Sequence, residues 1–254
     1  MRKTIDTLFV GKTLHEFDTL PSTNQYAIDL LASEKPSEGT VILTHNQYAG
    51  RGQLTNKWES EPGKNLTFSL ILYPTFLQAR NQFLLNQVVS LSVFATLKQY
   101  LAKGLTIKWP NDIYVFDKKI TGILIQNSLK GVRLQSAIIG IGLNVNQRKF
   151  LSDAPNPTSL ALELDKEVDL SSVLSVFCQH LERYYLQLKS NNILEIQQDY
   201  TNNLFRLGTL HDFKKVDGTP FKGIIEGVSS IGKLNVKTDE GSVSFAFKEI
   251  SYIL

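Results

Sequence analysis

The feature that most restricts how this chain can fold is a change in its hydrophobic pattern near residue 205. Before this point strand-like and helix-like segments alternate, and after it short strand-like segments follow one another, each separated by a turn signal. The turn signals are Asp217-Gly218, Gly232-Lys233 and Glu240-Gly241. Because short strands joined by tight turns close into small barrels, we expect two units: residues 1–206 with helices and strands, and residues 207–254 as a small β-barrel.

The first unit is expected to be α+β, judged from the periods of its apolar residues. Ser22-Thr23-Asn24-Gln25 fits a capping box, which predicts a helix from this point to Ser33. Apolar residues recur every three or four positions from Leu84 to Leu101, which is typical of a long amphipathic helix that ends before Gly104. The other predicted segments are the helices Leu170–Lys189 and Ile193–Asn203 and the strands Thr13–Phe17, Thr40–His45, Asn65–Tyr73, Ile113–Phe116, Ile120–Gln126 and Ala137–Val145.

The composition restricts the class of protein. The chain has 254 residues, 42% of them hydrophobic, which is enough for a sizeable core. The net charge is only +3 and no long basic run occurs, so we expect no contact with nucleic acid. There is no run of 18 apolar residues and no signal peptide, and the single cysteine, Cys178, excludes an intramolecular disulfide. A soluble cytoplasmic protein without membrane contact is therefore expected.

Two short motifs contain residue types that bind anions. Gly50-Arg51-Gly52 follows a predicted strand; its N–H groups and guanidinium suit a carboxylate or phosphate, and an ordinary surface turn is the alternative. Lys108-Trp109-Pro110-Asn111-Asp112 places a cation, an amide and a carboxylate at a bend that the proline imposes. Asp112 is a candidate metal ligand and Asn111 a candidate ligand of phosphate or sugar, whereas the alternative is a solvated turn around a buried tryptophan.

Two further features lie on predicted strands. Lys118 is expected to face water and Lys119 the opposite side, where a single lysine is usually solvated, so that only the neighbouring motifs favour a functional role. In Gly140-Ile141-Gly142-Leu143-Asn144 the two glycines share one face and leave room for a flat ligand, with Asn144 facing the same cavity. A third glycine and a following helix are missing, which excludes a dinucleotide-binding loop.

Read in order, these features resemble the motif set of biotin–protein ligases. The set consists of Ser22-Thr23-Asn24, Gln47 with Gly50-Arg51-Gly52, Lys108-Trp109-Pro110-Asn111-Asp112, Lys119 with Gly122, and Gly140-x-Gly142-x-Asn144. The resemblance implies a mixed β-sheet flanked by helices, with an SH3-like C-terminal barrel. It also implies that ATP activates biotin to biotinyl-5′-AMP, which then modifies a lysine of a biotin carboxyl carrier protein or domain of a biotin-dependent carboxylase.

The same resemblance implies a role for each motif residue. Biotin would contact Ser22, Thr23, Asn24, Gln47, Gly50, Arg51, Lys119, Gly122, Gly140 and Gly142. ATP would contact Arg51, Gln53, Asn56, Trp58, Lys108, Asn111, Lys119 and Asn144. The catalytic residues would be Arg51, Lys119 and Asp112. Lys119 would neutralise charge that grows on the phosphate, and Asp112 would bind Mg²⁺ or act as a base for the acceptor lysine.

The chain departs from the family pattern at one motif. Many members continue Gly-Arg-Gly with further arginines, whereas this chain has Gln53 and Asn56, which leaves open how tightly the loop holds the adenylate. About twenty residues precede Ser22, too few for the DNA-binding domain of repressor members. Two other interpretations are a lipoate ligase or octanoyl transferase, which shares the fold but needs a longer apolar tunnel, and a non-catalytic biotin sensor. A monomer and a homodimer both fit the sequence.

Overall fold

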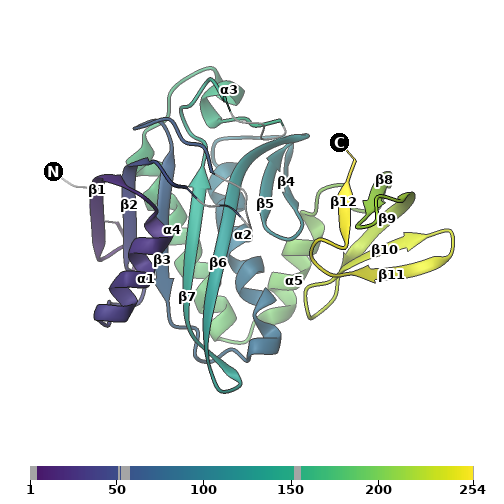
Figure 1. Ribbon diagram of the computed structural model, residues 1–254, viewed down its shortest axis with the longest axis horizontal. Helices are drawn as coiled ribbons and strands as arrows, with labels where there is room; N and C mark the ends of the chain where they lie inside the picture. Colours follow the sequence, from purple (N-terminus) through teal and green to yellow (C-terminus); the bar gives the residue numbers. More distant parts are fainter. Residues whose placement is uncertain (1–4, 51, 53–57, 152–155, 254) are drawn as a thin grey trace.

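The computed structural model describes residues 5–50, 52, 58–151 and 156–253 and contains two β-sheets (Figure 1). The larger sheet has seven strands in the order β1-β2-β3-β7-β6-β5-β4. The strands are β1 (Leu14–Leu20), β2 (Val41–Gln47), β3 (Leu66–Leu72), β4 (Leu105–Lys108), β5 (Asp112–Val115), β6 (Lys118–Lys130) and β7 (Arg133–Leu143). β1 and β2 are parallel and the other neighbours are antiparallel, so the predicted mixed sheet is confirmed.

Helices lie on both faces of this sheet. They are α1 (Thr23–Ser33), the 3-10 turn η1 (Ala79–Asn81), α2 (Phe83–Lys98), α3 (Leu160–Leu164), α4 (Leu170–Lys189) and α5 (Ile193–Asn202). α1 packs against β2, β3 and β7 on one face, whereas α2 and α4 cover the other face together with α5 (Figure 1). Ser22 is the N-cap of α1, as predicted, and its hydroxyl accepts a hydrogen bond from the backbone N–H of Gln25 at 3.4 Å.

The prediction that α2 is amphipathic is wrong. Nearly every residue of α2 is buried, because the helix lies between the sheet on one side and α4 and α5 on the other. Two of its buried hydroxyls donate within the helix: Ser92 to the carbonyl of Val88 and Thr96 to that of Ser92, both at 2.7 Å, whereas Oγ of Ser90 has no hydrogen-bond partner among the described residues. The helix ends at Lys98, and Gly104 follows with a φ of +80°.

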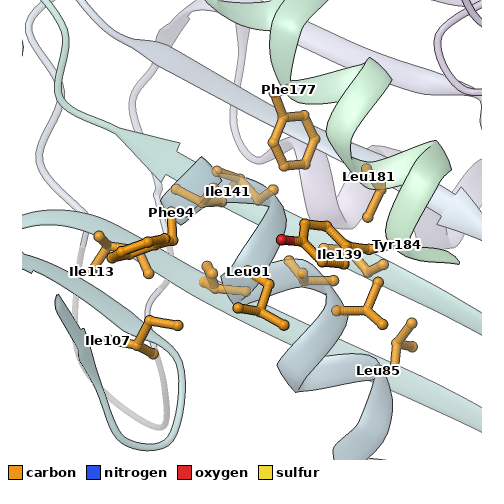
Figure 2. Close-up of a cluster of buried hydrophobic side chains, with 14 of the residues drawn as sticks. Leu85, Leu91, Phe94, Ile107, Ile113, Ile139, Ile141, Phe177, Leu181 and Tyr184 are labelled. Carbon is orange, nitrogen blue, oxygen red and sulfur yellow. The ribbon is translucent and has the colours of Figure 1, made fainter. Parts of the chain in front are cut away.

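The main core lies between the sheet and the helices α2 and α4 (Figure 2). Ile139 and Ile141 of β7 point into it, towards Leu91 of α2 and Phe177 of α4. Successive residues of a strand point to opposite faces. The core therefore directs the even-numbered residues of β7, including Gly140, to the face that α1 covers.

The second sheet is antiparallel, with the order β11-β10-β9-β8-β12 (Figure 1). Its strands are β8 (Leu210–Lys215), β9 (Pro220–Val228), β10 (Leu234–Thr238), β11 (Gly241–Phe245) and β12 (Ile250–Tyr252). Gly218, Gly232 and Gly241 have φ values of +88°, +88° and +116°, which confirms the three predicted turns. This sheet is compatible with the expected SH3-like unit, and its buried residues continue the main core.

The parts of the fold that were not predicted include β4, the 3-10 turn η1, the short helix α3, and the length of the β6–β7 hairpin, which extends to a turn at Gly131. Cys178 is buried, as expected, and its burial raises the pKa of the thiol to about 12. In the described part of the chain, none of the helices is long and apolar enough to cross a membrane.

Candidate active site

Residues of three neighbouring strands, most of them small, line up on the face that α1 covers. The strand registers place Thr67 of β3 beside Gly142 of β7 and Gly122 of β6. In the next row, Ser69 lies beside Gly140 and Leu124. We call these two rows the glycine face; its residues are Thr67, Ser69, Gly122, Leu124, Gly140 and Gly142. The sequence predicted that Gly140 and Gly142 share a face, and the structure confirms it.

Three side chains of the protein lie against these glycines. A Cβ atom on Gly140 would collide with the amide of Asn24, and one on Gly142 would overlap the indole of Trp58. A Cβ on Gly122 would lie 2.9 Å from Cζ3 of Trp58 and 3.6 Å from Cε of Lys119. The glycine face therefore connects Asn24 at one end, through Trp58, to Lys119 at the other.

The end near Asn24 is polar and buried. Ser22, Thr23 and Asn24, at the start of α1, are each at most 7% exposed. Gln47, the last residue of β2, accepts a 2.9 Å hydrogen bond at Oε1 from the backbone N–H of Thr23, so it stabilises the helix start. The structure thus brings together four residues that the family resemblance assigned to one ligand.

The other end carries an ion pair. Nζ of Lys119 lies 2.6 Å from Oδ2 of Asp112, and the two side chains are 28% and 27% exposed. The backbone of Lys119 is fixed by the segment that precedes α3: its N–H donates to the carbonyl of Asn156 at 2.8 Å, and its carbonyl accepts from the N–H of Thr158 at 2.9 Å. Lys118 is exposed, as expected, with Nζ 3.7 Å from Oε1 of Glu163. A fixed, partly exposed cation beside a carboxylate can bind an anionic group that arrives from solvent.

The motif from Lys108 to Asp112 forms the turn between β4 and β5, and much of it contacts the second sheet. Nε1 of Trp109 donates to the carbonyl of Gly232 at 3.0 Å, and its ring packs edge-on against Phe247. The carbonyl of Pro110 accepts a 2.7 Å hydrogen bond from the hydroxyl of Tyr200. The bend that Pro110 was expected to impose is therefore held by Tyr200 of α5 and by the second sheet.

Lys108 contacts two tyrosines. Its Nζ donates to the hydroxyl of Tyr114 at 2.9 Å and lies 4.6 Å and 5.0 Å from the ring centres of Tyr114 and Tyr252. Burial lowers the pKa of Lys108, and burial raises the pKa of both tyrosines. In this arrangement the ammonium group already has partners within the protein.

The two motif asparagines are buried. Nδ2 of Asn111 donates to the carbonyl of Ile123 at 3.0 Å, and Nδ2 of Asn144 donates to that of Thr158 at 3.0 Å. Oδ1 of Asn144 has no hydrogen-bond partner among the described residues, and the same holds for Nε1 of Trp58. Eight buried side-chain atoms of the described residues lack a hydrogen-bond partner, and these two lie at the candidate site, where a bound ligand can supply one.

Three of the predicted residues, Arg51, Gln53 and Asn56, lie outside the described residues. Gly50 is described, and a Cβ atom there would lie 2.6 Å from the carbonyl oxygen of Trp58 and 2.8 Å from Nε2 of Gln47. Gly50 and Trp58, the two ends of the segment 50–58, therefore lie next to each other at the candidate site.

Sequence reasoning missed Ser69 and Gln126. Ser69 is fully buried and lies within hydrogen-bond distance of both Thr23 and Asn24, and Gln126 accepts from Asn24. A serine in an alternating strand gives no signal of its own, because its partners are set by the register of distant segments.

The model of the biotin/lipoate A/B protein ligase family matches residues 16–144. This chain belongs to that family. The bifunctional ligase/repressor BirA of Bacillus subtilis is 31% identical to it over 243 residues, which cover 93% of this chain and 73% of BirA.

Two further relatives of the family match along most of their length. A biotin–[acetyl-CoA-carboxylase] ligase of Paracoccus denitrificans is 28% identical, over 87% of this chain and 92% of its own. The biotin protein ligase of Aquifex aeolicus, solved with biotin and ATP, superposes with a TM-score of 0.78 and 28% identity, covering 94% of this chain and 98% of the other. The match to the fold of that enzyme thus covers 94% of this chain.

Proposed function

We propose that this protein is a biotin–protein ligase, which activates biotin with ATP and transfers it to a lysine of an acceptor protein. The observation that carries the proposal is the arrangement of the glycine face, with a buried polar cluster at one end and the Lys119–Asp112 pair at the other. Biotin has matching ends, a ureido ring and a carboxylate. The likeness to the Aquifex aeolicus enzyme, solved with biotin and ATP, supports the same assignment.

In this proposal each end of the site recognises one end of biotin. Ser22, Thr23 and Gln47 form hydrogen bonds with the ureido ring. These bonds replace the ones that the ring makes to water, so the ring is buried without unpaired polar groups. Gly122 and Gly142 allow a flat group to approach the backbone, and in this structure the indole of Trp58 occupies that space, so it must move aside for the ligand. Lys119 then faces the carboxylate and the α-phosphate.

The reaction has two steps. A carboxylate oxygen of biotin attacks the α-phosphorus of ATP, the bond to the bridging oxygen breaks, and pyrophosphate leaves with that electron pair. The neutral ε-amine of the acceptor lysine then attacks the acyl carbon, AMP leaves, and the amine gives up a proton. Lys119 stabilises the negative charge that grows on the phosphate oxygens, and Asp112 is the nearby carboxylate that can accept the proton.

Magnesium fits the site as a partner of ATP. Within residues 5–50, 52, 58–151 and 156–253 no cluster of three His, Cys, Asp or Glu side chains could hold a metal ion by itself. Mg²⁺ commonly binds through one or two carboxylates together with substrate phosphates, and the partly exposed Asp112 supplies such a carboxylate. When bound, Mg²⁺ neutralises phosphate charge.

We also propose that the acceptor is a biotin carboxyl carrier protein or domain, and that the chain divides at residues 206 and 207 into a catalytic unit and an SH3-like unit. The second sheet holds the turn that precedes Asp112, through Trp109 and Gly232. This contact supports a role for the second unit in ATP use and transfer.

Biotin-dependent exchange of label between pyrophosphate and ATP tests the proposed function, because it reports the first step alone. We expect exchange with biotin and none with lipoate or octanoate, and the label of biotin should then appear on a purified carrier domain. Exchange with lipoate or octanoate instead of biotin would identify a different member of the family. Binding of biotin without exchange would identify a biotin sensor.

A further inference from the structure

The buried end of the glycine face contains a chain of five hydrogen-bonding side chains. Oγ of Ser69 lies 2.5 Å from Oδ1 of Asn24 and 2.7 Å from Oγ1 of Thr23. Nδ2 of Asn24 donates to Oε1 of Gln126 at 2.9 Å, and Oγ1 of Thr23 lies 3.3 Å from Oε1 of Gln47. Ser69 is thus the centre of a chain of side-chain contacts. This chain runs from Gln126, an exposed residue of β6, to Gln47 at the end of β2.

The distances fix the orientation of the amide of Asn24. A separation of 2.5 Å to Ser69 lies within the range of O–H···O bonds and below that of N–H···O bonds. The atom that faces Ser69 is therefore the amide oxygen, which can only accept. It follows that Nδ2 faces Gln126 and that the single proton of Ser69 is donated to Asn24.

This assignment determines the role of the Thr23 hydroxyl. With the proton of Ser69 already donated, the 2.7 Å contact between the two hydroxyl oxygens needs the proton of Thr23; otherwise lone pairs would face each other. Thr23 therefore donates to Ser69 and not to Oε1 of Gln47, which lies farther away at 3.3 Å and already accepts from the backbone N–H of Thr23. Its hydroxyl has only lone pairs to offer another group. In contrast, a hydroxyl without this chain could turn to donate or to accept.

We propose that Ser69 and Gln126 are positioning residues that fix the hydrogen-bond polarity of the site, so that Thr23 presents an acceptor to an N–H group of the ureido ring. The inference rests on the proposed function, since it assumes a cyclic urea as the ligand. Ser69 does not touch the ligand in this scheme and acts through Asn24 and Thr23. The site therefore prefers a ring that carries N–H at the position facing Thr23, and it rejects a ring that carries oxygen at that position.

The test compares equilibrium binding of biotin with that of its two cyclic carbamate analogues, in which one ureido N–H is replaced by oxygen. We expect the wild-type protein to bind at least one analogue ~10- to 100-fold more weakly than biotin, because two acceptors then face each other. In Ser69→Ala the Thr23 proton is free to turn towards the analogue. We expect biotin to bind ~10-fold more weakly and the preference over that analogue to fall to ~3-fold or less.

Gln126 provides a second test at an exposed position, where a substitution leaves the core intact. Gln126→Met removes the acceptor that orients Asn24, and we expect the preference for biotin to fall. Gln126→Glu keeps an acceptor and should retain the preference of the wild type. The matched control is Ser136→Ala, which removes a buried hydroxyl with the same 2.7 Å separation, to Ser128, from the same sheet.

The outcomes separate the inference from the proposed function. If the wild-type protein binds biotin but does not distinguish the analogues, or if folded Ser69→Ala keeps the full preference, the inference is wrong. If Ser69→Ala does not fold, Gln126→Met decides, and an unchanged preference in that variant overturns the inference. If the wild-type protein binds no biotin at all, the proposed function itself fails.

Discussion

Replacement of Lys119 by alanine should separate catalysis from stability. In the structure its Nζ lies 2.6 Å from Oδ2 of Asp112, and both side chains are about a quarter exposed. An ion pair so accessible to water contributes at most about 1 kcal/mol to the free energy of unfolding. A donor aimed at charge that develops in a transition state typically contributes about 3–4 kcal/mol. We therefore expect adenylate formation to slow by ~100-fold or more, with little loss of stability.

Single-turnover formation of biotinyl-5′-AMP measures the rate of adenylate formation, and urea unfolding measures the free energy of unfolding. Lys118→Ala is the matched control, because it removes the neighbouring lysine, whose side chain is exposed and 3.7 Å from Glu163. That variant should keep the rate of the wild type. The electrostatic role is refuted if Lys119→Ala forms adenylate within a few-fold of the wild-type rate, or if Lys118→Ala is slowed to the same extent.

Three other perturbations follow from the same geometry. Asp112→Asn should lower the rate of adenylation at every Mg²⁺ concentration or raise the Mg²⁺ concentration needed for half-maximal rate; an unchanged Mg²⁺ titration would leave Asp112 as a turn residue. The indole of Trp58 lies against the glycine face, so biotin should change the fluorescence of the wild-type protein but not of Trp58→Phe, and a retained change would assign the signal to Trp109. Truncation after Gly208 should uncover Trp109 and impair ATP use more than biotin binding, provided that circular dichroism shows a folded chain; a folded and fully active fragment would contradict this.

Features set by neighbouring residues were predictable from the sequence. The N-cap at Ser22 needs only the residues of the following turn, and the structure shows the expected hydrogen bond. The shared face of Gly140 and Gly142 follows from the period of a strand. The motif from Lys108 to Asp112 was recognised as a bend, and it forms the turn between two strands.

Features set by the register of distant segments were not predictable. Ser69 meets Asn24 because β3 pairs with β7 in one particular register and α1 packs above both, and neither fact is present in the local sequence. For the same reason the partners of Lys108 were not foreseen, since Tyr252 lies in the second sheet, 144 positions away. Helix α2 was taken as amphipathic because its apolar residues recur every three or four positions, whereas in the structure most of the residues between them are buried as well, and Ser92 and Thr96 donate hydrogen bonds within the helix.

The two ends of the candidate site depend on different parts of the chain. The polar end is held by α1, β2 and β3, through Thr23, Gln47 and Ser69, and none of these contacts involves the second sheet. The Lys119–Asp112 end follows a turn that is anchored to the second sheet by Trp109. A shift of that sheet therefore moves Asp112 before it moves the polar end. For this reason, damage to the second sheet should appear first in the steps that use ATP and the acceptor, while the affinity for the ureido ring remains set by the first sheet.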